Sequence, residues 1–187
     1  MRGEDDGVTL LELVVGMAVM SIFGLMLTGA VLQTYHVTNG TDAAATAQSQ
    51  LNGAFLRLDT EIRYAAGISA PGPATGTDRY VEYLTTNSGT DVCGELRLNG
   101  AAGQLQWRQW ARGGKPGGWT VLASDVKSGT PFTFHAAGAG DAYQTLTVSL
   151  TSAGGATTKE FHTDFAALNS TPTVDSAAYC VEGRSVP

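Results

Sequence analysis

The feature that most constrains this chain is an uncharged apolar run close to its N-terminus. Residues 13–32 contain no charged residue and no proline, and their polar interruptions are the small residues Ser21 and Thr28. As an α-helix with a rise of about 1.5 Å per residue, this run is about 30 Å long, which matches the hydrocarbon core of a bilayer. The sequence therefore predicts a helix over residues 8–35 that spans a membrane once.

Glu12 directly precedes this run and is the one charged residue between Asp6 and Asp42. A carboxylate at the centre of a bilayer costs about 2.5–3.5 kcal/mol on insertion scales, so a carboxylate at the entrance needs an explanation. One explanation places Glu12 at the headgroup level of an ordinary single-pass anchor. The other explanation comes from the pattern of residues that surrounds Glu12.

The residues before Glu12 complete a recognisable pattern. A short polar leader ends in Gly7, an apolar residue follows, and Glu12 is the fifth residue after the glycine. This pattern resembles the N-terminal processing segment of type IV prepilins and type II secretion pseudopilins. The resemblance implies that prepilin peptidase removes residues 1–7 by cutting between Gly7 and Val8, and that it methylates the new amine of Val8. It also implies that Glu12 pairs with the N-terminal amine of a neighbouring pilin or pseudopilin subunit during assembly.

A secretory signal peptide is the competing interpretation of the same segment. Such a peptide has a basic start, an apolar region of about 7–15 residues and a small-residue cleavage site. Here the leader is acidic and the apolar run is longer, although Thr28-Gly29-Ala30 could serve as a weak cleavage site. The prepilin resemblance implies instead a single-pass protein of the cytoplasmic (inner) membrane. Its C-terminal domain would lie outside the cytoplasm, and the protein would later enter a pilus or pseudopilus.

A second helical pattern covers residues 41–67. Apolar residues recur there at three- and four-residue spacing, as on one face of an amphipathic helix: Leu51, Phe55, Leu58, Ile62 and Ala65. Thr41 or Asp42 could begin this helix, and Gly67 is expected to end it. Between the two helical segments, Asn39-Gly40 is expected to loosen or kink the chain.

The hydropathy period changes from 3.6 to 2 after a Pro- and Gly-containing linker at residues 68–78. Strands are expected at residues 80–85, 92–98, 104–111, 119–123, 132–135, 143–150 and 158–165, separated by turn-forming residues. No second long helical stripe lies among them, so the connections should be antiparallel. We expect an α+β fold in which the long helix packs on an antiparallel β domain of residues 79–187. This is the pilin-like architecture.

The two cysteines, Cys93 and Cys180, are expected to form a disulfide. An isolated pair on the oxidising side of a membrane is more often a disulfide than a metal or redox site, and two buried free thiols are the alternative. The bridge would close a long loop, worth about 4–5 kcal/mol in the chain-entropy model. It would hold the irregular C-terminal tail against an early strand.

No catalytic, metal or cofactor site is expected. His36, His135 and His162 lie on separate elements without metal-ligand spacing, and no glycine pattern frames a nucleophilic serine. Asp141 lies in a glycine-rich loop but offers calcium too few carboxylates. The net charge of −6 argues against a broad attraction to nucleic acid.

One basic-aromatic cluster, at residues 107–115, could in principle stack single-stranded nucleic acid: Trp107, Arg108, Trp110, Arg112 and Lys115. In a strand, however, Trp107 and Arg108 point to opposite faces. Core tryptophan beside solvated arginine is therefore the favoured interpretation.

These observations lead to two functional hypotheses, and a third, a membrane-anchored enzyme, is disfavoured because the sequence shows no catalytic constellation. The first is a structural minor subunit of a type IV pilus or pseudopilus, and residues 56–65 and 119–126 look like segments of J-type pseudopilins. The second is a filament-tip binding module, an adhesin or DNA-uptake subunit. An exposed aromatic or basic patch around Trp110 and Arg112 would favour the second hypothesis.

Overall fold

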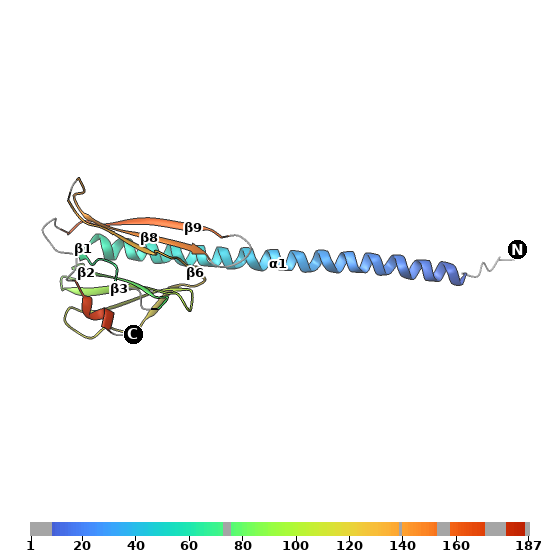
Figure 1. Ribbon diagram of the computed structural model, residues 1–187, viewed down its shortest axis with the longest axis horizontal. Coiled ribbons are helices and arrows are strands. Elements are labelled where there is room, and N and C mark those ends of the chain that lie inside the picture. Colours follow the sequence, from blue (N-terminus) through green and yellow to red (C-terminus); the bar gives the residue numbers. More distant parts are fainter. Residues whose placement is uncertain (1–8, 73–75, 139, 153–157, 171–178, 186–187) are drawn as a thin grey trace.

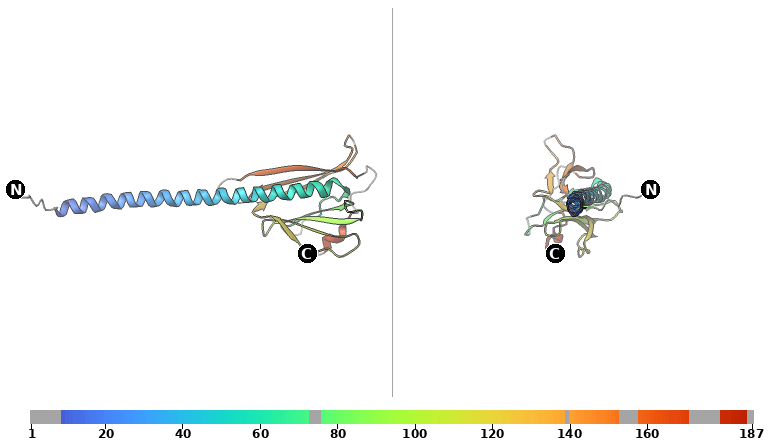
Figure 2. Two further views of the ribbon diagram at one scale, coloured as in Figure 1. Left: turned by 180° about the vertical axis from the view of Figure 1, so that it is seen from behind. Right: turned by 90° about the vertical axis from the view of Figure 1, so that its right-hand side faces the viewer.

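The computed structural model describes residues 9–72, 76–138, 140–152, 158–170 and 179–185. A long helix leads into a β domain made of two antiparallel sheets (Figure 1). The sheets flank the C-terminal part of the helix, while its N-terminal part projects alone from the domain (Figure 2). The predicted α+β class, with a long N-terminal helix packed on antiparallel sheet, is confirmed.

Helix α1 runs without a break over Leu10–Arg63. The two helical segments predicted from the sequence are therefore one helix, which continues through residues 39–41. Its start is capped by Thr9, whose side chain accepts a hydrogen bond from the Glu12 backbone N–H at 3.3 Å. In the last turn, Arg63 pairs with Asp59 at 2.6 Å, and the arginine charge is favourable at a helix C-terminus.

The amphipathic stripe of α1 is buried as predicted. Its buried positions follow the three- and four-residue spacing of one helix face: Ala47, Leu51, Ala54, Leu58 and Ile62. The larger of these side chains, those of Leu51, Leu58 and Ile62, join one core with apolar side chains from both sheets, including Val81, Leu96, Leu146 and Phe165. The sheets and the helix therefore stabilise one another.

The prediction that the helix extends to Gly67 is wrong. The helix ends at Arg63, and strand β1, Ala65–Ile68, follows after Tyr64. Gly67 lies in this strand, where a Cβ atom would overlap the ring of Tyr179 from the C-terminal segment. The glycine thus serves a close approach to a distant part of the chain, and it does not serve as a helix stop.

The first sheet is a five-stranded meander in the order β1-β2-β3-β4-β5. Its strands after β1 are β2 Arg79–Thr85, β3 Val92–Asn99, β4 Gln104–Ala111 and β5 Thr120–Ala123, and each pairs antiparallel with its neighbour. The inner face carries apolar side chains toward α1. These four strands were predicted to within one residue at each end.

The second sheet is centred on β8, Gln144–Ser152. On one side, β8 pairs with β6, Val126–Lys127, and with β7, Phe132–His135. On the other side, it pairs with β9, Glu160–Ala167. The sequence predicted an antiparallel β domain, and the structure divides its strands between two sheets. The chain turns from β5 into it at Asp125, which has a φ of 57°. Gln144 joins the sheets, because its Oε1 accepts from the Ile68 N–H at 2.8 Å.

Candidate functional site

The N-terminal part of α1 is the first candidate site. Gly7 and Val8, the predicted cleavage and methylation site, lie outside the described residues. Glu12 lies in the first helical turn and is exposed in the isolated chain. A negative charge in this turn is favourable, because the helix N-terminus carries partial positive charge.

Residues Leu10–Tyr35 are long and apolar enough, by length and composition, to cross a membrane. No part of this segment is buried against the β domain. The hydroxyl groups of Ser21 and Thr28 donate to the backbone carbonyls of Met17 and Gly24, each at 2.8 Å. These polar side chains are satisfied within the helix, as an apolar environment requires. A single N-terminal apolar helix that could serve as a membrane anchor is therefore present.

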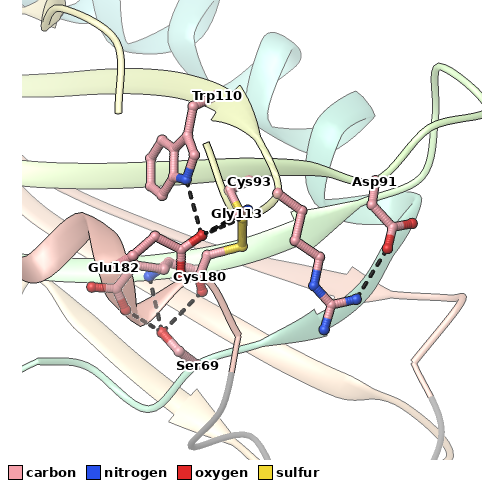
Figure 3. The surroundings of a disulfide bond; sticks show 9 residues. Ser69, Asp91, Cys93, Trp110, Gly113, Cys180 and Glu182 are labelled. Carbon is pink, nitrogen blue, oxygen red and sulfur yellow. Dashed lines mark hydrogen bonds and ion pairs between the residues drawn. A yellow bond between two sulfur atoms is a disulfide. The ribbon is translucent and has the colours of Figure 1, made fainter. Parts of the chain in front are cut away.

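The C-terminal segment on the outer face of the first sheet is the second candidate site. Cys93 of β3 and Cys180 form the predicted disulfide, with their Cα atoms 5.6 Å apart (Figure 3). Leu84, Trp110 and Tyr179 pack around it in a small buried cluster. The short 3-10 helix η2, Val181–Ser185, follows Cys180 and covers the sheet.

Under η2 lies a row of charged side chains from three adjacent strands. Glu82, Glu95 and Arg108 are cross-strand neighbours on β2, β3 and β4, and each is at most 1% exposed. The Arg108 Nε donates to Glu95 Oε2 at 2.6 Å. Burial raises the pKa of Glu95 to about 7, although the adjacent Arg108 guanidinium opposes this shift.

The C-terminal segment supplies partners for this charged row. Arg184 donates from Nε to one oxygen of Glu82 at 2.7 Å and from a terminal nitrogen to the other at 2.6 Å. The backbone carbonyl of Gly183 accepts from Arg108 at 2.8 Å. Glu182 accepts from the indole N–H of Trp110 at 3.1 Å (Figure 3). The row and the segment are therefore complementary in charge and in hydrogen bonding.

The basic-aromatic cluster predicted at residues 107–115 does not form one surface. Trp107 faces the core, where its indole donates to the Tyr83 hydroxyl at 2.7 Å. Trp110 faces outward but is only 6% exposed, because the C-terminal segment covers it. Arg112 is exposed and pairs with Asp91 at 3.0 Å. The burial of the tryptophans was predicted.

The expectation of a solvated arginine at position 108 is wrong. Arg108 is 1% exposed, and its guanidinium also lies 3.9 Å from the ring centroid of Trp119. Arg97 covers the same ring at 4.1 Å, so Trp119 is held between two cations. Alternation along β4 correctly assigns the face of Arg108, but it carries no information about a distant segment that covers this face.

The outer face of the second sheet carries an open polar groove of about 480 Å³. His135, Asp141, Ser149, His162 and Asp164 are among its lining residues, so the tertiary structure gathers groups that are scattered in the sequence. The Ser149 hydroxyl lies 2.9 Å from Nδ1 of His162, while Asp164 lies 3.7 Å from its Nε2. The second distance exceeds a hydrogen bond, so these three groups do not form a connected proton relay.

The histidine side chains and Asp141 form no metal cluster within the described residues, and the side chain of His36 lies outside them. One group in the described part of the chain has potential ligand atoms within 4.8 Å of one another, namely Cys93, Cys180 and Glu182. Its two sulfur atoms are bonded to each other, so they are not thiolate ligands.

Comparisons with protein-family models, with curated proteins and with solved structures found no match to this chain. The features on which a function can be based are therefore those of the chain itself. They are an exposed apolar helix at the N-terminus, a two-sheet β domain built around its C-terminal part, and a disulfide that holds the tail.

Proposed function

We propose that this chain is a prepilin-like minor subunit of a type IV pilus or of a type II secretion-type pseudopilus. Prepilin peptidase would remove residues 1–7, and the mature chain would wait in the membrane before it joins a filament through its N-terminal helix. The observation that carries this proposal is the geometry of α1. One continuous helix combines an apolar segment that is not buried in the isolated chain, Leu10–Tyr35, with a stripe buried in the β domain.

The apolar part of α1 needs a partner outside its own domain. Its large side chains are exposed in the isolated chain, for example Leu25 at 75% and Met20 at 75%. Lipid would cover them before assembly, and the helices of other pilin or pseudopilin subunits would cover them afterwards. Gly16, Gly24 and Gly29 have no neighbouring atom within 4 Å of a built Cβ, so the helix backbone is open to close helix contacts at each of these positions.

Glu12 would supply the specific contact in this assembly. Cleavage after Gly7 would create a cationic amine at Val8, and a carboxylate inside an apolar bundle is stabilised by such a partner. The pairing would set the axial position of each incoming subunit. The continuous helix would transmit this position rigidly to the β domain at its other end.

The test is the N-terminus of the chain recovered from its native membrane. We expect N-terminal sequencing and intact mass to show a chain that begins at Val8 and carries one added methyl group. The Gly7→Leu variant should remain uncut, and Glu12→Gln should be cut but fail to enter filaments. A wild-type chain that begins after Ala30 would refute the proposal, as would an uncut wild-type chain in cells with active prepilin peptidase.

The alternative function is a filament-tip binding module. The patch expected to favour it, around Trp110 and Arg112, is covered in part by the C-terminal segment. We therefore favour the structural subunit. Deletion of the chain distinguishes the two functions, because loss of a structural subunit should impair filament assembly, whereas loss of a tip module leaves the filament intact.

A further inference from the structure

The C-terminal segment 179–185 lies on its sheet as a peptide ligand lies in a recognition site. Each of three consecutive residues makes a specific polar contact: Glu182 to the indole of Trp110, Gly183 to Arg108, and Arg184 to Glu82. The sheet residues in these contacts come from β2 and β4, far from the segment in sequence. The site is thus formed by the sheet, and the segment occupies it from outside.

The site selects arginine at position 184 by geometry. The guanidinium contacts both carboxylate oxygens of Glu82, and it also donates to the backbone carbonyl of Ala70 at 2.5 Å. The planar fork of arginine can make these contacts together, whereas the ammonium group of lysine is a single point charge. The Glu82 carboxylate is fully buried, so a neutral side chain in place of Arg184 would leave it poorly compensated.

The site also selects glycine at position 183. A Cβ atom there would lie 2.7 Å from the ring of Trp110 and 2.8 Å from the carboxylate of Glu95. Real Cβ contacts are not this short, so a larger residue would push the backbone away from the sheet and break its contact with Arg108. The chemical signature of the occupant is therefore a glycine followed by an arginine.

The segment fits this site incompletely. The carboxylate of Glu95 lies next to Gly183, and its Oε1 is a buried polar atom that has no hydrogen-bond partner among the described residues. An unsatisfied buried polar group is unfavourable. Cys180, the residue that leads into η2, has a φ of 54°, in the left-handed region that is unfavourable for a residue with a side chain. Both features lower the free energy needed to lift the segment.

The contact between residues 181–185 and the sheet is also of a kind that can separate in water. Beyond Cys180, the segment is held through polar and charged groups, and these regain hydration when they separate. The disulfide keeps Cys180 on β3 while residues 181–185 lift away. A helix of five residues has little stability of its own, so its order depends on these contacts.

We propose that this face of the first sheet is a binding site for a Gly-Arg peptide segment of another protein chain, and that residues 181–185 are its internal occupant. The incoming segment displaces Arg184 from Glu82 and takes its place. Without Arg184, the buried carboxylate of Glu82 loses the cation that contacts both of its oxygens, so the opened site attracts a cationic ligand at this position. This proposal does not depend on the role of the N-terminal helix.

The test uses the full chain in detergent micelles with its disulfide intact. Two variants vacate the site: Arg184→Ala, and a chain that ends at Cys180. The probe is a fluorescent synthetic peptide with the sequence of residues 181–187, and binding is followed by anisotropy. We expect saturable binding to both variants, at least about tenfold tighter than to the wild type, because the tethered segment competes at high effective concentration. Replacing the glycine of the peptide by alanine, or its arginine by alanine, should abolish binding.

The matched control is Arg63→Ala. Arg63 is an exposed arginine that pairs with Asp59 at the end of α1, so its loss should leave the segment in place and binding as weak as in the wild type. Adding Glu82→Gln to the vacated variants should remove binding. The proposal is overturned if neither vacated variant binds the peptide, or if the alanine peptides bind equally well. It is also overturned if circular dichroism shows that both vacated variants are unfolded, because the segment is then an indispensable part of the domain.

Discussion

Glu95 should make the β domain less stable as the pH rises from about 5 to about 8. This carboxyl group is fully buried between Glu82 and Arg108, and its pKa is raised from 4.5 to about 7 in the folded protein. The folded state therefore binds the Glu95 proton more tightly than the unfolded state does. The resulting stabilisation is fully present below about pH 4.5 and is lost as the pH rises through about 7.

The size of this effect follows from the pKa difference. At about 1.4 kcal/mol per unit, a rise from 4.5 to about 7 corresponds to about 3 kcal/mol of unfolding free energy. Glu95→Gln keeps the shape of the protonated side chain and cannot ionise, so it should remove this part of the pH dependence. The variant should match the wild type near pH 5 and be more stable than it by about 3 kcal/mol near pH 8.

The assay is urea unfolding of the full chain in detergent, with the disulfide intact and tryptophan fluorescence as the probe. The control is Glu160→Gln, an exposed carboxylate at the start of β9, which should keep the wild-type pH dependence. The reasoning is refuted if the wild type loses no stability between these pH values. It is refuted equally if Glu95→Gln is the less stable protein near pH 8, because Glu95 would then act as an ionised partner of Arg108.

Three further changes test the packing of the domain. Gly67→Ala should destabilise the domain by about 1–3 kcal/mol, because the new methyl group overlaps the Tyr179 ring. Gly53→Ala, on the open side of α1, should stabilise the domain by about 0.5–1 kcal/mol, and chemical unfolding compares the two variants. Leu58→Ala should cost about 2–5 kcal/mol, because Leu58 is fully buried, while Leu56→Ala at a 74% exposed position should change the unfolding free energy by at most about 0.5 kcal/mol. Replacing both cysteines by alanine should lower the free energy of unfolding by about 4–5 kcal/mol, the chain-entropy value for a sequence separation of 87. An unchanged urea midpoint would contradict this prediction.

Local patterns in the sequence account for most of the secondary structure. The stripe that includes Leu51, Leu58 and Ile62 predicts the buried face of α1, and alternation predicts seven of the strands closely. Three short elements were missed: β1, β6 and η2. Residues of β1 were assigned to the end of the predicted helix, β6 has only two residues, and η2 is one short turn in the irregular tail. Their conformations depend on the strands or side chains that they contact.

The second candidate site was predicted only in part. The pairing of Cys93 with Cys180 followed from the presence of two cysteines in a chain with a membrane-type helix, and the structure confirms it. The burial of Glu82, Glu95 and Arg108 was not predicted, because charged residues on the outer face of a strand are normally solvated. One feature of the sequence indicates this burial. Three charged residues share one face of adjacent strands, and a cysteine on the same face connects the C-terminal tail to it.

The sequence by itself determined the elements whose causes are local: the uncharged apolar run, the helix stripe and the alternating strands. These depend on spacing within a few residues, which the chain order records directly. The tertiary structure alone decided that the strands divide between two sheets, that Gly67 lies against Tyr179, and that η2 buries a charged row. These outcomes depend on contacts between segments far apart in the chain, and the periodicity of one segment does not specify which distant segment will cover it.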